Sequence, residues 1–106
     1  MPILFEILDP MRRKVICTDD VWHSHILTRH PIMRGLENEV KLAIEKPSIG
    51  IFQDSSLSSR SIYYLRQTGT PRYLKAVVEF DDNDIGEVIT AFLTDAPKSG
   101  ERLIWP

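Results

Sequence analysis

The chain has little cysteine and no long apolar run. Cys17 is the only cysteine among 106 residues, so no internal disulfide can form, and a reducing cytoplasm is the expected compartment. No apolar stretch approaches the roughly 18 residues that a membrane-spanning helix requires, and the first residues lack the basic-then-apolar order of a secretory signal. Internal repeats and linkers are also missing. With 42% hydrophobic residues, the sequence predicts one cytoplasmic domain over residues 1–106, with no membrane partner.

Acidic residues are missing between Ser55 and Val78. The residues that follow, 79–87, contain five acids and no base, so charge of the two signs is segregated along the chain. The net charge of −2 argues against tight non-specific binding to nucleic acid, which needs several clustered cations. Two interpretations stay open for the acid-free stretch: solvated loops and strand faces, or a surface that faces an anion. Its cations are Arg60, Arg66, Arg72 and Lys75.

Hydrophobic periodicity predicts an α+β domain. Residues 3–8 and 14–18 are typical of a strand pair around a polar turn. Two helices follow, one over about 21–30 and an amphipathic one from Met33 to Pro47, with apolar residues every three or four positions. Later runs alternate in polarity, which indicates strands. We expect both helices on one face of a twisted, mainly antiparallel sheet of about four to five strands. These later runs are residues 48–52, 61–66, 72–80, 87–94 and 102–105.

All three histidines lie within eight positions, in the first predicted helix. On a regular α-helix His23 and His25 diverge by roughly 200°, and His25 and His30 by roughly 140°, so they cannot share a metal ion. His30 falls on the side of the buried apolar residues, whereas His25 lies beside Arg29 at the edge of the helix. No metal site is predicted. Each imidazole is either a hydrogen-bonded structural group or a group that moves protons near neutral pH.

A metal-independent ribonuclease could use these residues without any cofactor. It needs a base for the 2′-hydroxyl proton, an acid for the leaving oxygen, and cations or hydrogen-bond donors around the phosphorus. Along an extended strand Tyr64 and Arg66 share a face, and so do Tyr73 and Lys75, which suits stacked bases next to phosphates. The alternative for the tyrosines is cross-strand packing. Candidates for the cations and donors are Arg60, Arg66, Lys75, Tyr63, Tyr64 and Thr90.

Five segments together carry a family resemblance. In order they read WHSHILTRHP, AIEKPSIGIF, SIYYLR, YLKAVVEF and VITAFLT. From about Lys14 to Trp105 the chain resembles small phage-associated nuclease-like domains of the barnase, EndoU, colicin and RelE (BECR) superfamily. The resemblance implies N-terminal helices followed by a twisted antiparallel sheet. It also implies a metal-independent, RNA-cleaving toxin or processing enzyme, with RNA as substrate and an antitoxin or immunity protein as partner.

The resemblance also assigns roles to residues. His25 before the isoleucine and His30 before the proline become acid/base or phosphate-contacting groups, and Thr90 becomes a hydroxyl donor to the scissile phosphate. Ile32 departs from the pattern, since such domains often carry an acid after the His-Pro pair. Two other classes stay open: a catalytically silent domain that binds RNA or a protein, and a module that holds a small anion. The remaining candidates are Arg66 and Lys75 for charge stabilisation, and Arg29, Arg60, Tyr63, Tyr64 and Tyr73 for substrate binding.

Overall fold

The first two strands form the predicted hairpin. The computed structural model describes residues 2–106, and in it β1 (Ile3–Leu8) pairs antiparallel with β2 (Lys14–Thr18). Asp9 organises the turn, because its Oδ1 accepts a hydrogen bond from the backbone N–H of Arg13 at 2.9 Å. Its Oδ2 accepts a second one from Nε of the same arginine at 3.0 Å. A buried carboxylate therefore fixes the polar turn that the sequence predicts.

The helical region is less regular than the sequence predicts. Over residues 21–30 the chain forms a π-helix and then a short α-helix, and Thr18 Oγ1 accepts the first free backbone N–H, that of Val21, at 3.1 Å. Gly35, at a φ of 84°, separates a 3₁₀ turn from the amphipathic helix, which starts at Glu37 rather than near Met33. No helix within residues 2–106 has the length and apolarity to cross a membrane. The segments are η1 (Val21–Ile26), α1 (Leu27–Arg29), η2 (Pro31–Met33) and α2 (Glu37–Glu45).

All strands belong to one mixed, open sheet with the order β1-β2-β6-β5-β4-β3-β7. The prediction of four to five strands is too low, because the opening hairpin joins the sheet that the five later runs form. The hairpin joins through parallel pairing of Lys14–Ile16 with Ile85–Glu87, and the other pairs are antiparallel. Local alternation cannot report a pairing between such distant segments. The later strands are β3 (Ile51–Gln53), β4 (Arg60–Arg66), β5 (Tyr73–Phe80), β6 (Ile85–Thr94) and β7 (Arg102–Trp105).

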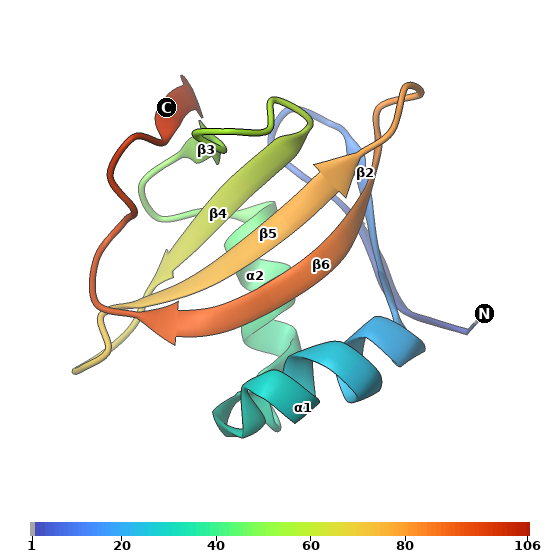
Figure 1. The fold of residues 1–106 in the computed structure, drawn as a ribbon, viewed down its shortest axis with the longest axis vertical. Helices are drawn as coiled ribbons and strands as arrows, with labels where there is room; N and C mark the ends of the chain where they lie inside the picture. Colours follow the sequence, from blue (N-terminus) through green and yellow to red (C-terminus); the bar gives the residue numbers. More distant parts are fainter. Residues whose placement is uncertain (1) are drawn as a thin grey trace.

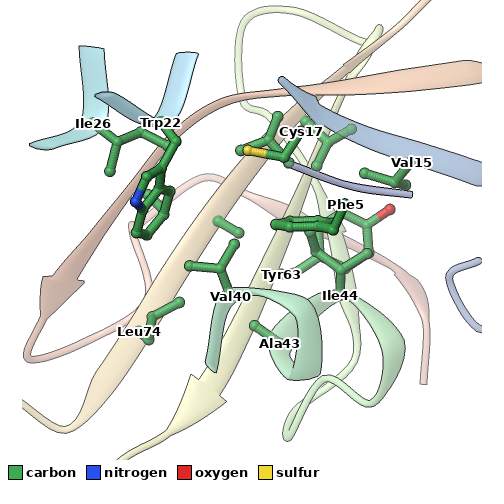
Figure 2. Packing of buried hydrophobic residues seen from close by; sticks show 14 of the residues in the cluster. Phe5, Val15, Cys17, Trp22, Ile26, Val40, Ala43, Ile44, Tyr63 and Leu74 are labelled. Atoms are coloured by element: carbon green, nitrogen blue, oxygen red, sulfur yellow. The ribbon is translucent and has the colours of Figure 1, made fainter. Parts of the chain in front are cut away.

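The core lies between one face of the sheet and helix α2, which Figure 1 shows behind strands β4, β5 and β6. Val40 and Ile44 of α2 are buried there. Figure 2 shows the indole of Trp22, from η1, directed toward Val40 and Leu74. Alternation along β5 follows the prediction, since every second residue enters this core. Those residues are Leu74, Ala76, Val78 and Phe80, all buried.

Candidate functional site

The sheet face opposite α2, which we call the outer face, carries three rows of paired side chains on β4, β5 and β6. Neighbouring rows are about 7 Å apart, because two residues of extended chain rise by that distance. Five of the predicted site residues lie in these rows: Tyr64, Arg66, Tyr73, Lys75 and Thr90. The hairpin row is Arg66, Tyr73 and Thr94; the middle row is Tyr64, Lys75 and Phe92; the inner row is Ile62, Val77 and Thr90.

His30 joins the helical region to the middle row. Its ring stacks on Phe92, with 5.2 Å between ring centroids and 29° between ring planes. The contact is possible because β2 pairs with β6 only at Ile85–Glu87, and the helical segments η1 and η2 pack beside β6 beyond that point. Nζ of Lys75 lies 5.7 Å from the centroid of the same Phe92 ring. A half-buried imidazole and an ammonium group of the outer face therefore contact one shared aromatic ring.

A carboxylate already neutralises the lysine of the middle row. Oε2 of Glu101 lies 2.9 Å from Nζ of Lys75, and the two side chains are only 1% and 9% exposed. Oε1 of the same glutamate accepts a hydrogen bond of 2.5 Å from the hydroxyl of Tyr64. Burial, followed by this hydrogen bond, raises the pKa of Tyr64 well above its usual value. Both residues predicted to face RNA are thus engaged by the segment that precedes β7.

The segment before β7 also contacts Tyr64 through a second residue, Lys98. The backbone N–H of Lys98 donates a hydrogen bond of 3.1 Å to the Tyr64 hydroxyl. Glu101 carries no sequence signal that would place it here, because it stands between a loop and a short apolar run. Phe92 is also missing from the predicted site, although its position two residues after Thr90 places it on the same strand face.

Tyr63 lies on the other face of the sheet. Its buried hydroxyl donates to Oδ2 of Asp9 at 2.7 Å and accepts from a guanidinium nitrogen of Arg13 at 3.3 Å. Burial, with the Asp9 charge adding to it, raises the pKa of this phenol well above its usual value. The Arg13 guanidinium in turn lies 3.9 Å from the Phe80 ring centroid. Tyr63 therefore anchors the turn of the first hairpin and has no place on the outer face.

Arg60 lies at the acidic end of the outer face. Its Nε is 3.0 Å from Oε1 of Glu79, the residue directly opposite on β5. Hydrogen bonds from Ser59 and Arg60 lower the pKa of the Glu79 carboxyl below its usual value. Arg60 is thus paired within the chain, whereas the guanidinium of Arg66, at the opposite end of β4, forms no ion pair within residues 2–106.

The other two histidines are separate from this arrangement. Nδ1 of His23 lies 3.0 Å from the carbonyl oxygen of Asp19 and 3.1 Å from its Oδ1, which ties it to the start of η1. His25 and Arg29 are both exposed. Because His23 and His25 lie on a π-helix, the angles calculated for a regular α-helix do not apply to them. No group of three or more potential metal ligands occurs among the described residues.

Comparisons with protein-family models, with curated proteins and with solved structures found no match. Any function assigned to this chain therefore depends on the chemistry of its own residues. The structure brings His30 to the sheet face that carries Tyr64, Lys75 and Thr90, and it keeps Tyr63 away from that face.

Proposed function

We propose that this chain is a nuclease-like domain of the BECR type that cleaves RNA without a metal, at the junction of His30 and the outer face. The observation that carries the proposal is the stacking of His30 on Phe92, whose ring also lies near Lys75. It brings an imidazole, the side chain that most often serves as a general acid or base, to an aromatic surface suited to stacked bases. The order of elements, helices before the central strands, supports the fold family.

The proposed reaction is an internal transesterification. The 2′-oxygen of RNA attacks the adjacent phosphorus and the bond to the 5′-oxygen breaks, which leaves a 2′,3′-cyclic phosphate and a 5′-hydroxyl end. His30 takes the 2′-hydroxyl proton, and an acid must return a proton to the leaving oxygen. The resemblance offers His25 for that role, although His25 is exposed on η1 and does not belong to the stack of His30 on Phe92. The Thr90 hydroxyl, one row from Phe92, is the candidate donor to the phosphate. Arg29, exposed and adjacent to His30, is the candidate contact to the RNA backbone.

A second candidate function is a domain of the same fold that binds RNA or a protein and cleaves nothing. The observation in its favour is the Lys75–Glu101 pair, because a lysine that is already neutralised adds little charge at the phosphorus.

If the chain is an active toxin in the cytoplasm, an antitoxin or immunity protein would be needed to protect the cell. The single buried thiol, Cys17, suits such a reducing compartment.

The test is incubation of the pure protein with bulk RNA in excess EDTA, followed by analysis of the ends. Cyclic-phosphate ends are expected, and His30→Ala should reduce the rate about 10²- to 10⁴-fold. His23→Ala is the matched control, since the exposed imidazole of His23 is paired with Asp19 at the start of η1, and it should retain the full rate. RNA binding without cleavage would establish the second candidate. Cleavage that persists in both His25→Ala and His30→Ala would show that the site is elsewhere.

A further inference from the structure

An open surface pocket lies at the turn between β4 and β5, and the proposed chemistry does not use it. It has a volume of about 330 Å³, which is at the small end of ligand-binding pockets. Two of its residues, Arg66 and Tyr73, belong to the hairpin row of the outer face. Its walls are formed by Arg66, Gln67, Gly69, Arg72 and Tyr73.

The charge of this pocket is positive and uncompensated. Neither Arg66 nor Arg72 forms an ion pair within residues 2–106, whereas Arg60 and Lys75 on the same two strands are both paired with glutamates. All four cations lie in the acid-free stretch, and only Arg60 and Lys75 are reached by carboxylates from outside it, Glu79 and Glu101. Two guanidinium groups in one pocket are suited to a phosphate, whose oxygens accept their paired N–H donors.

Tyr73 adds a fixed aromatic ring. It is half-buried, and its ring packs edge-on against Tyr64, with 5.8 Å between centroids and 74° between planes. The surrounding backbone is also fixed, because the N–H of Gln67 donates to the carbonyl of Arg72 at 2.6 Å. The N–H of Arg66 donates to the Ser48 hydroxyl at 2.8 Å. A ring held in this way offers a stacking surface for a nucleobase at little cost in conformational entropy.

Arg66 is also distant from the imidazole to which the resemblance links it. β4 and β6 are separated by β5, so Arg66 and Phe92 lie on strands about 10 Å apart and in different rows.

We propose that the hairpin pocket is a nucleotide-binding site, with the phosphate on Arg66 and Arg72 and the base against Tyr73. The nucleotide is either free or one unit of an RNA strand. Only its assignment to an RNA substrate rests on the proposed function.

The experiment measures binding of adenosine 5′-monophosphate and of inorganic phosphate to the full chain by calorimetry. Adenosine 5′-monophosphate should bind at least about ten-fold more tightly than phosphate, because stacking of the base adds to the phosphate contacts. Arg66→Ala with Arg72→Ala should weaken both ligands at least about ten-fold. Tyr73→Leu should weaken binding of the nucleotide but leave binding of phosphate unchanged. Arg34→Ala, at an exposed arginine outside this pocket, is the control and should change neither affinity.

The outcomes separate this site from the cleavage reaction. Absence of nucleotide binding, equal affinity for phosphate, or affinities unchanged in the double arginine variant would overturn the pocket assignment, whether or not the protein cleaves RNA. If the protein binds the nucleotide but cleaves no RNA, the assignment of the pocket holds and the proposed nuclease function is wrong. In a final experiment, a single-stranded RNA oligonucleotide is added to the complex with adenosine 5′-monophosphate. If the oligonucleotide competes for binding, the pocket holds a nucleotide of an RNA strand. If it does not compete, the pocket binds a free nucleotide.

Discussion

Nζ of Lys75 and Oε2 of Glu101 lie 2.9 Å apart beneath the segment that leads into β7, with almost no exposure to solvent. The pair links the centre of the sheet to a residue that follows β6, the strand next to β5. Removal of one partner from a buried ion pair leaves the other charge desolvated and unpaired, which costs far more than the net value of the pair. The stability of the outer face therefore depends on Glu101.

Glu101→Gln should lower the free energy of unfolding by about 3 kcal/mol, since Lys75 then keeps a buried charge with no counter-charge. Urea denaturation followed by circular dichroism measures the change. The double variant Lys75→Met with Glu101→Leu replaces both charges by apolar groups and should recover most of the loss. Equal stability of wild type and Glu101→Gln would show that Lys75 is solvated.

Tyr63→Phe should destabilise the protein by about 1.5–3 kcal/mol, because the Asp9 carboxylate loses a buried hydrogen bond from the phenol. Tyr73→Phe is the matched control. Its hydroxyl makes no hydrogen bond with residues 2–106, so its cost should stay within about 0.5 kcal/mol. Both values come from the same denaturant titration. Equal costs at the two positions would contradict the anchoring role of Tyr63.

Gly50→Ala should destabilise the chain more than Gly69→Ala. Both glycines have positive φ, 99° and 88°, so each alanine costs about 1–2 kcal/mol in backbone strain. At Gly69 a Cβ would meet nothing within 4 Å, whereas at Gly50 it would collide with the backbone carbonyl of Trp105 in β7. Hydrogen exchange should show that only Gly50→Ala loosens the amides between β3 and β7. Identical exchange in the two variants would show that the contact of residue 50 with the Trp105 carbonyl does not cause the destabilisation.

Cys17 should be unreactive in the folded protein. Burial, with a smaller effect of Asp19, raises the pKa of its thiol to about 12, whereas a thiol in an unfolded chain ionises near 8.5. The folded state therefore holds a proton that the unfolded state releases, so this contribution to stability is complete below about pH 8.5 and declines as the pH rises toward 12.

Alkylation with iodoacetamide at pH 8.5 measures this protection. The folded protein should react at least about 100-fold more slowly than the urea-unfolded protein, because so little of the buried thiol is ionised. In Cys17→Ala the decline of stability between pH 8.5 and 12 that is due to this thiol should disappear. Fast alkylation without urea would mean that β2 opens readily.

Local patterns predicted the alternation along residues 72–80 and the polar turn after residues 3–8, because strand alternation and turn residues act over a few positions. They could not predict the parallel joining of β2 to β6, which depends on segments far apart in sequence. The sequence also did not indicate the π-helix, since helical periodicity in so short a stretch fits an α-helix as well as a π-helix. Glu101 shows the same limit in the candidate site: its partner Lys75 is known only once β5 and the segment after β6 are placed together.

The parallel contact between Lys14–Ile16 and Ile85–Glu87 sets an order of assembly for the chain. Strands β4, β5 and β6 follow one another closely and pair with their neighbours, so they can form early. The first hairpin is also local, but its docking on β6 must wait for a contact that closes a loop over residues 17–84, which makes docking a late and slow step. Until then one edge of β6 stays open to pairing with another chain, so we expect aggregation during refolding to be most pronounced before the hairpin docks.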